Sequence, residues 1–488
     1  MSLRGKTISG LFWTFSQQFS VKAINFVVQI VLARILLPED FGLIAMLSVF
    51  MAIGSTLMDS GLTSSLIRTK EADEQDFSTV FYMNLVASLL VYLLIFVSAP
   101  FIALFFNQPL LEDIVRVYTL TFVIRAFSQV QNTRLTKAMN FKLQMTIQIP
   151  SVIIGGGIGI LLAYRGMGVW ALVWMNIVQA ILSSLQLWLR SGWTPKFIFN
   201  MEKLRYHFNF GYKLTLSGLL NTIFTNVYNL VIGKYFSAAQ LGYYNRADTL
   251  RMFPVLNLSS ALNKVTYPMF ASIQDDNVKL RKAYQILMQQ VLYWLAPVMA
   301  LLIVLAEPLF RFILTEKWLP AVPYFQLLCL SGVLYPIHAY NLNILNVKGR
   351  SDLFLRLEII KKAIIAVGII CAVPFGIYGL LYFQLVSTVL AYFINTHYSG
   401  RMINYSTGRQ FLDIIPTLVL AAGVGVIAWI LYIYMISRFC IADIGVILLI
   451  GIVYMFCYLS ISIVLKFPAF LEFKRLFLAR FMKNMNSP

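Results

Sequence analysis

Lysine and arginine residues lie near the centres of several apolar stretches of this chain, and each stretch is long enough to cross a lipid bilayer. The hydrocarbon core of a bilayer is about 30 Å thick, so a helix needs about 20 apolar residues to cross it. One charged side chain at the centre costs about 2.5–3.5 kcal/mol on insertion scales. A chain that accepts this cost repeatedly, with cations, is expected to line a water-filled path for an anionic ligand.

The apolar stretches predict an all-α, polytopic membrane protein with about 14 transmembrane helices. Hydrophobic residues make up 59% of the 488 residues and charged residues 12%, which lies outside the range of soluble globular proteins. We place the spans at 8–34, 41–63, 79–105, 112–133, 144–164, 168–189, 209–233, 244–270, 285–307, 321–346, 354–374, 376–398, 412–436 and 441–465.

Basic residues are distributed unevenly over the connections between these spans. Most lie on the side that holds both termini and the even-numbered connections, which the positive-inside rule assigns to the cytoplasm. The net charge of +19 therefore reflects topology and contact with anionic headgroups, and it does not indicate a nucleic-acid partner. The opposite side carries only Arg34, Arg165, Lys234, Arg311, Lys317 and Arg438.

Self-comparison indicates an internal repeat. Asn25–Gly42 aligns without gaps with Thr225–Gly242, and Leu135–Gly166 aligns with Leu345–Gly376. An even number of helices per repeat keeps both copies in the same orientation, so we expect two pseudo-symmetric six-helix bundles followed by two additional helices. Repeats of this kind place a substrate site at their interface and change state by rocking. The expected division is 1–200, 201–400 and 401–488, the last part comprising two helices and a basic cytoplasmic tail.

Two pseudo-equivalent spans carry matching polar stripes at helical spacing. Such a face cannot point at lipid, so it lines a water-filled cavity or forms hydrogen bonds to a neighbouring helix. The first span carries Thr14, Gln18, Lys22, Asn25 and Gln29, and its repeat mate carries Lys213, Ser217, Asn221, Thr225 and Asn229.

Cations outnumber acids within the spans. An excess of bases suits phosphate or carboxylate groups, which arginine binds in a bidentate manner. The acids are mainly Asp59, Asp248 and Glu358, of which Glu358 has the spacing to pair with Lys362 and leave Lys361 free. The basic residues are Lys22, Arg116, Arg125, Lys213, Arg246, Arg251, Lys264, Lys361 and Lys362.

Sequence signatures of catalysis are absent. The chain has no Walker A pattern, nucleophile elbow or HExxH motif, and its four cysteines and three histidines are scattered. We therefore expect neither an enzyme nor a metal or cofactor site, apart from a coupling proton or sodium ion.

Five motifs in order resemble the polysaccharide transporter family, notably its colanic-acid and lipopolysaccharide O-antigen type exporters. This family belongs to the multidrug/oligosaccharidyl-lipid/polysaccharide exporter superfamily. The resemblance covers residues 1 to about 400 and is weak across the last two helices. The motifs are the opening MSLRGKTISGLFWT, LARIL-PEDFGL after the first span, D-GL-SSLI-TK from Asp59, IQDD…KLR from Ile273 and EKWLPAVPYFQLL from Glu316.

The resemblance implies a flippase that carries undecaprenyl-diphosphate-linked oligosaccharide to the outer leaflet of the bacterial inner membrane by alternating access. Its partners would be the lipid-linked substrate, membrane lipids, and a polymerase with other polysaccharide-assembly proteins. A peptidoglycan-precursor flippase and a multidrug antiporter remain alternatives within the superfamily, and a membrane glycosyltransferase is a remote one.

In this hypothesis the stripe and cation residues contact substrate. The diphosphate and any acidic sugars would engage Lys22, Arg125, Lys213, Arg251 and Lys361, with Lys264 as a further candidate. Asn25, Gln29, Asn221 and Asn229 would bind sugar hydroxyls. Asp59, Asp248 and Glu358 are the candidates for ion coupling.

Overall fold

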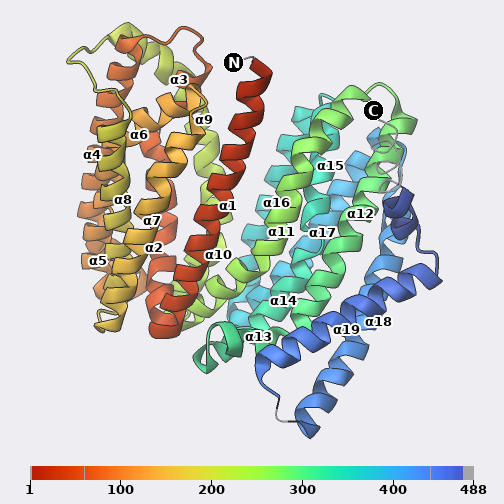
Figure 1. Cartoon of the computed structure of the whole chain (residues 1–488). Coiled ribbons are helices and arrows are strands. Elements are labelled where there is room, and N and C mark those ends of the chain that lie inside the picture. The colour runs from red at the N-terminus through yellow and green to blue at the C-terminus, as the bar shows by residue number, and fades with distance from the viewer. Residues whose placement is uncertain (1–2, 60, 440, 476–488) are drawn as a thin grey trace. The chain divides into compact units, whose positions relative to one another are not determined.

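The computed structural model describes residues 3–59, 61–439 and 441–475, with the side chains of all of these except 3–12 and 260–265. Within these ranges every regular element is a helix, so the all-α prediction is confirmed (Figure 1). Contacts divide the chain into two compact units, Met1–Asn245 and Arg246–Pro488.

Unit 1 contains ten helices and the first residues of an eleventh among its described residues. They are α1 (Leu3–Ile35), α2 (Pro38–Asp59), α3 (Leu62–Arg68), α4 (Glu74–Phe106), α5 (Leu110–Tyr118), α6 (Leu120–Lys137), α7 (Phe141–Tyr164), α8 (Val169–Arg190), α9 (Met201–Thr225), α10 (Val227–Tyr235) and the start of α11 (Ala238–Ser272).

Unit 2 takes up the rest of α11 and the remaining helices of the described chain. These are α12 (Asn277–Val304), α13 (Ala306–Ile313), the 3-10 helix η1 (Glu316–Ala321), α14 (Val322–Gly332), α15 (Tyr335–Val347), α16 (Ser351–Ala372), η2 (Val373–Phe375), α17 (Gly376–Met402), α18 (Thr407–Arg438) and α19 (Asp443–Val464).

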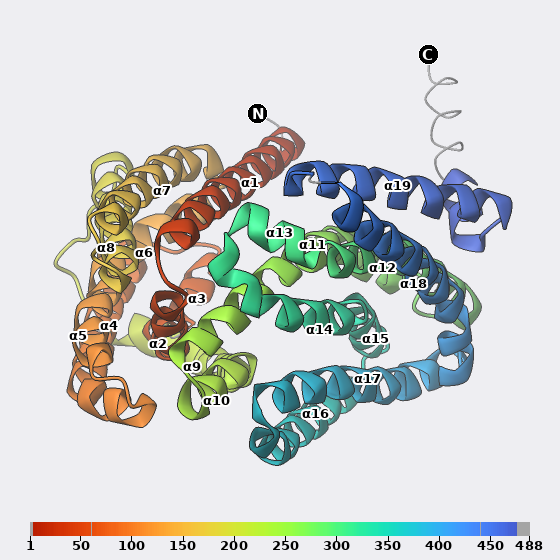
Figure 2. The ribbon, with the colours of Figure 1, turned by 90° about the horizontal axis from the view of Figure 1, so that it is seen from below.

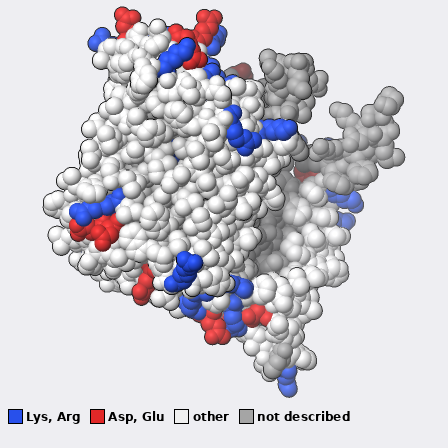
Figure 3. All heavy atoms as spheres, turned by 60° about the vertical axis from the view of Figure 1, so that its left-hand side comes forward, with Lys and Arg blue, Asp and Glu red and all other residues white. Residues whose placement is uncertain are grey.

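Ten segments of the described chain are long and apolar enough to cross a membrane, and one of them, 351–402, holds both α16 and α17. The protein is therefore a multi-pass membrane protein. The predicted spans 112–133, 209–233 and 244–270 are largely helical but are not among these ten segments. On the face shown in Figure 3, uncharged residues form a broad band, and charged residues gather mainly toward its ends.

Several predicted spans are interrupted helices. Span 112–133 breaks at Thr119, whose hydroxyl donates to the carbonyl of Val115 at 2.7 Å. Span 209–233 breaks at Asn226, whose amide donates to the carbonyl of Thr222 at 2.9 Å. Both side chains compete with the backbone for a carbonyl acceptor, which favours a local distortion of the helix. The break before α15 precedes Pro336, which lacks a backbone donor.

The helices of unit 1 pack around α7 and α4. The first helix lies against α7, α7 lies against α8, and α6 contacts both α4 and α8 (Figure 2). Helix α9 packs against α2, α3 and α4, although the predicted boundary at 200 would place it with the following bundle. The predicted division at 200 and 400 stays a prediction.

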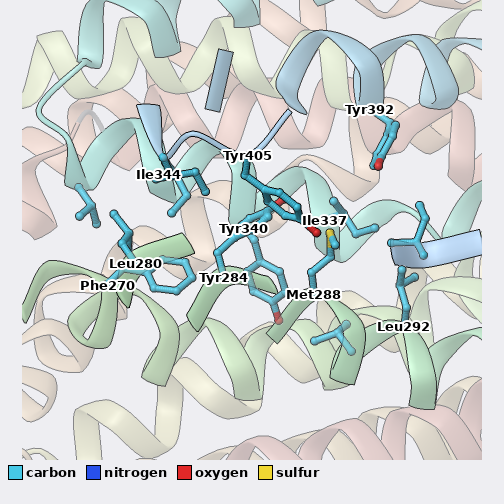
Figure 4. Close-up of a cluster of buried hydrophobic side chains, with 14 residues drawn as sticks. Phe270, Leu280, Tyr284, Met288, Leu292, Ile337, Tyr340, Ile344, Tyr392 and Tyr405 are labelled. Carbon is cyan, nitrogen blue, oxygen red and sulfur yellow. The ribbon is translucent and has the colours of Figure 1, made fainter. Parts of the chain in front are cut away.

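A cluster of buried aromatic and aliphatic side chains forms the core of unit 2 (Figure 4). Phe270 on α11, Tyr284 on α12 and Tyr340 on α15 belong to it, and each is fully buried. The Tyr284 hydroxyl lies 3.0 Å from Oδ1 of Asn341 and 3.1 Å from Oε1 of Gln410. These hydrogen bonds satisfy polar groups that would otherwise be costly to bury.

Helix boundaries recur at the first offset predicted from sequence. Helices α1 and α10 end at Ile35 and Tyr235, and α2 and α11 begin at Pro38 and Ala238, which in both cases is a shift of 200 residues. The same capping bond recurs as well. The Leu37 amide donates to the Asp40 carboxylate at 3.0 Å, and the Ser237 amide donates to the Gln240 side chain at 3.2 Å.

The second offset, 210 residues, also recurs in the structure. Helices α6 and α15 end at Lys137 and Val347, and α7 and α16 begin at Phe141 and Ser351. Positive φ angles occur at the equivalent positions Gly166 (76°) and Gly376 (75°). Local conformation therefore follows the sequence repeat.

Candidate functional site

A polar pocket of about 310 Å³ lies within unit 1, between α1, α6, α7 and α8. Amide and hydroxyl side chains dominate its wall, which is unusual for a cavity among membrane-spanning helices. The lining residues are Val21, Arg125, Ser128, Gln129, Asn132, Gln144, Ile147, Gln148, Ser151, Val152, Gln179, Ala180, Ser183 and Leu187.

Helical periodicity brings these polar groups together. Helix α6 contributes residues at positions 125, 128, 129 and 132, and α7 contributes residues at 144, 147, 148, 151 and 152. Spacings of three and four place each set on one face of its helix. The two faces meet across the pocket, and α8 completes the wall with Gln179 and Ser183.

Internal hydrogen bonds fix part of the wall. The buried Gln144 amide donates to Oδ1 of Asn132 at 3.0 Å and to Oγ1 of Thr136 at 2.8 Å. Gln17 on α1 donates to Oε1 of Gln148 on α7 at 2.8 Å. These hydrogen bonds join α6 to α7 and α1 to α7, so the side chains that form them have a structural role.

Arg125 is the charged residue among the described lining residues, and its side chain is exposed. It has no ion-pair partner in the described part of the chain. A cation at mid-depth in the predicted span 112–133 requires water or an anion nearby. Arg125 is therefore the candidate anion-binding group among the described lining residues of this pocket.

The predicted coupling residue Asp59 is connected to this pocket. Its carboxylate accepts a short hydrogen bond from the Thr63 hydroxyl. The Gln129 amide in turn donates to Oγ1 of Thr63 at 3.3 Å. One hydroxyl thus joins a carboxylate at the end of α2 to a residue of the pocket wall.

The two predicted polar stripes lie largely at the surface of unit 1. Lys22 on α1 and Lys213 and Asn221 on α9 are exposed, whereas Asn25, Gln29 and Asn229 are half-buried. Lys213 Nζ also lies 5.8 Å from the ring centroid of Tyr212. Because ammonium groups at such depth avoid hydrocarbon, these exposed lysines favour an aqueous environment along α1 and α9.

The predicted site residues of unit 2 are arranged differently. Arg251 is buried, donates to Oγ of Ser331 at 2.8 Å, and forms an ion pair with Asp248. On α16, Glu358 pairs with Lys361, one turn away, so the prediction that Lys361 is left free is wrong. Lys264 lies in α11, but its side chain falls outside the part of the structure that is described.

A buried charge cluster fixes another region of unit 1. The Asp76 carboxylate lies 3.0 Å from Nζ of Lys203 and 3.1 Å from Nε2 of His207, and His207 Nδ1 lies 2.8 Å from Oγ of Ser65. The hydrogen bond to Asp76 raises the pKa of Lys203. Burial lowers the pKa of His207 below 6.5 despite the nearby carboxylate. The neutral imidazole then donates to Asp76 and accepts from Ser65.

Arg125 is predicted from the sequence, whereas the amides and hydroxyls around it are not. Their signal was present, because polar residues recur at helical spacing in two consecutive spans. This signal does not by itself predict a pocket, because membrane helices also use neutral polar side chains for hydrogen bonds between helices. Helix α8 carries the same signal, since Asn176, Gln179, Ser183 and Gln186 follow one another at spacings of three and four.

The proteins that this chain resembles are named for polysaccharide biosynthesis. A family described as polysaccharide biosynthesis protein matches residues 31–323. The lipopolysaccharide biosynthesis protein WzxC of Escherichia coli (strain K12) is 28% identical over 442 residues, 88% of this chain and 89% of WzxC. The teichuronic acid biosynthesis protein TuaB of Bacillus subtilis (strain 168) is 24% identical, over 88% of this chain and 89% of TuaB.

Solved structures show the same fold at low sequence identity. The lipid II flippase MurJ, in an inward closed conformation, has a TM-score of 0.67 and 14% identity, over 93% of this chain and 98% of MurJ. An inward-facing multidrug resistance MATE transporter of the MOP superfamily has a TM-score of 0.60 and 18% identity, over 79% of this chain and 96% of the transporter.

Proposed function

Because this chain belongs to the polysaccharide biosynthesis protein family, we propose that it flips an undecaprenyl-diphosphate-linked oligosaccharide across the bacterial inner membrane. The substrate would move from the cytoplasmic to the outer leaflet for assembly of a polysaccharide or lipopolysaccharide. Relatives named for lipopolysaccharide, teichuronic acid and succinoglycan biosynthesis support this substrate class.

The observation that carries the proposal is the set of exposed cations on the polar helices of unit 1. Lys22, Arg125 and Lys213 are exposed at membrane depth, where a charge facing lipid would be costly. A substrate with a diphosphate and polar sugars fits a path lined by such groups and by a pocket rich in amides. Alternating access would let these groups meet the substrate from each side in turn.

The intramembrane acids favour an anionic substrate over a cationic drug. Asp248 is paired with Arg251, and Glu358 with Lys361. Both carboxylates are thus compensated within unit 2 and are poorly suited to recognising an organic cation. The multidrug antiporter alternative therefore has little support in the described residues.

Asp59 is the carboxylate that we favour for ion coupling. It has a hydroxyl partner, Thr63, rather than a cation among the described residues, so no ion pair there occupies it. We propose that a gradient of one of these ions drives transport. The polymerase and other assembly proteins would act after the substrate reaches the outer leaflet.

The proposal assigns no catalytic step to this chain, and it places both termini in the cytoplasm. The topology follows from the predominance of Lys and Arg on that side. Cysteine labelling from either side of the membrane, with single cysteines introduced in the 273–276 and 403–406 connections, tests this topology. Both connections should react from the cytoplasm.

The central experiment is mass spectrometry of lipid-linked glycans from cells that lack this protein and from complemented cells. We expect one undecaprenyl-diphosphate oligosaccharide to accumulate in the deletion strain and to clear on complementation. An unchanged lipid-linked pool, in cells that make the glycan and have no redundant flippase, contradicts the proposal.

Variants then link the transport to the cations. Lys22→Ala and Arg125→Ala should complement poorly although they insert and accumulate normally. Arg165→Ala, which removes an exposed cation away from the polar pocket, is the matched control. Full export by the quadruple alanine variant at Lys22, Arg125, Lys213 and Arg251 would exclude a role for these cations in substrate passage.

A further inference from the structure

The pocket in unit 1 has the size and surface of a monosaccharide site. Its volume of about 310 Å³ corresponds to about ten water molecules, which is comparable to one pyranose ring with its hydroxyl groups. Sugar hydroxyls both donate and accept hydrogen bonds. Amide and serine side chains can do the same, whereas the aliphatic residues of a typical membrane helix cannot.

Part of the wall remains available to a ligand. Gln179 and Ser183 on α8 form no hydrogen bond within the described residues, and both are only half-buried. They face the pocket together with Arg125, which also lacks an ion-pair partner there. The side chains of Arg125, Gln179 and Ser183 thus leave one cation, one amide and one hydroxyl available to a ligand.

We propose that this pocket binds one acidic sugar residue of the transported oligosaccharide, with Arg125 pairing with the sugar carboxylate. Gln179 and Ser183 then hydrogen-bond to ring hydroxyls. The proposal rests on the proposed function, because it takes the sugar from the lipid-linked substrate. It adds that the glycan carries a carboxylate and that unit 1 alone recognises it.

The number of charges in the wall favours a carboxylate over the diphosphate. A guanidinium matches one carboxylate in a bidentate arrangement. Phosphate groups are typically bound by clusters of cations, and the described lining residues provide one cation only. A wholly neutral sugar would leave Arg125 without an anion at a depth where an isolated charge is costly.

Binding of simple glycosides to the full-length protein in lipid nanodiscs tests this assignment. Saturation-transfer NMR titrations would compare methyl glucuronide, methyl glucoside and inorganic diphosphate. The wild type should prefer the glucuronide over the glucoside by about tenfold, as expected for a hydrogen-bonded charge pair. Arg125→Gln should abolish this preference while both glycosides still bind.

Two further variants separate the roles of the wall. Arg125→Lys should retain part of the preference, because it keeps the charge but loses the bidentate geometry. Gln179→Leu combined with Ser183→Ala should weaken both glycosides similarly and leave their ratio unchanged. Arg165→Gln, a change of the same kind at an exposed arginine outside the pocket, should behave as the wild type.

Three outcomes overturn the assignment. They are equal affinity for the two glycosides, no detectable binding of either, and displacement of the glucuronide by diphosphate at Arg125. The last result would indicate that Arg125 binds the diphosphate of the lipid carrier instead of a sugar carboxylate. Failure of the flippase proposal is separately visible, because an unchanged pool of lipid-linked glycan in the deletion strain does not affect the glycoside preference of the purified protein.

Discussion

Gly42 on α2 and Gly242 on α11 pack in a reciprocal contact within unit 1. A Cβ atom at Gly42 would lie 1.8 Å from the carbonyl oxygen of Ala238, and one at Gly242 would lie 2.0 Å from that of Pro38. Each glycine thus meets the residue four positions before the other. Since the two glycines are equivalent in the sequence repeat, this reciprocity is what local two-fold symmetry between the copies would produce.

Replacing either glycine by alanine should therefore destabilise the protein. The added methyl group overlaps a backbone oxygen, so α2 and α11 must separate. Overpacking of this kind lowers the free energy of unfolding by about 1–3 kcal/mol. The intrinsic preference of a helix for alanine over glycine, about 1 kcal/mol, opposes this effect but is smaller. A lower thermal unfolding midpoint of purified Gly42→Ala and Gly242→Ala would report the change.

Gly157 on α7 provides the matched control. A Cβ added there meets nothing within 4 Å, so Gly157→Ala should keep or raise the unfolding midpoint. If all three variants unfold at the wild-type temperature, the close approach of α2 and α11 is not rigid in the folded protein.

The buried His207 should make the stability of the protein depend on pH. Its folded-state pKa is lowered below 6.5 by burial, so protonation favours the unfolded state. Its contribution is fully present above pH 6.5 and is lost as the pH falls toward the lowered folded-state value. Unfolding midpoints measured between pH 8 and pH 5 should decrease over the acidic part of this range.

His207→Gln separates this effect from other titrating groups. It removes the imidazole and weakens the contacts with Asp76 and Ser65. Leaving a buried polar group without its partner lowers the free energy of unfolding by about 1–3 kcal/mol. The variant should be less stable at pH 8 and should lose less stability on acidification than the wild type. An identical acid dependence in both proteins would assign the pH effect to other residues.

The fold was more predictable from the sequence than the site. Apolar stretches about 20 residues long determine where helices can cross a bilayer, and the repeat offsets determined paired helix ends such as Ile35 and Tyr235. Charges were also informative, because Arg125 proved to line a pocket. Charge alone, however, does not distinguish a ligand-binding residue from a buried ion pair.

Tertiary contacts distinguish a cation in a buried ion pair from one that lines a pocket. Arg251 looked equivalent to Arg125 in sequence, yet it is paired with Asp248 and bonded to Ser331, a residue 80 positions away. Such a long-range partner cannot be identified from helical spacing. The same is true of Gln179, which reaches the pocket only because α8 packs against α6 and α7.

A double-mutant cycle on Arg251 and Asp248 tests whether this pair is structural. Arg251→Gln leaves the Asp248 carboxylate without its partner and should destabilise the protein by about 1–3 kcal/mol. This is below the range for fully buried pairs, because Asp248 is 34% exposed. Asp248→Asn in the same protein should restore part of the unfolding midpoint and of the export activity.

The transport assay distinguishes a structural role of Arg251 from direct contact with substrate. If Arg251 contacts substrate directly, Asp248→Asn will restore stability while export remains defective. Protein levels in the membrane, measured alongside export, separate the two results.

Asp59 should control ion coupling through its link to the pocket. Its hydrogen bond to Thr63 and the Thr63 contact with Gln129 connect the carboxylate to the pocket wall. Asp59→Asn mimics the neutral carboxyl group permanently. In proteoliposomes with an imposed pH gradient, it should lower gradient-driven transport about tenfold, within the usual coupling range of about 1–3 kcal/mol, while glycoside binding persists.

Thr63→Val tests the route of this coupling, because it keeps the Asp59 carboxylate and removes the hydroxyl between it and Gln129. It should reproduce the Asp59→Asn defect in part. Repeating the assay with a sodium gradient identifies the ion, since the gradient that drives wild-type transport is the one that Asp59→Asn should fail to use. Equal gradient-driven transport by the wild type and Asp59→Asn would show that coupling runs through another residue.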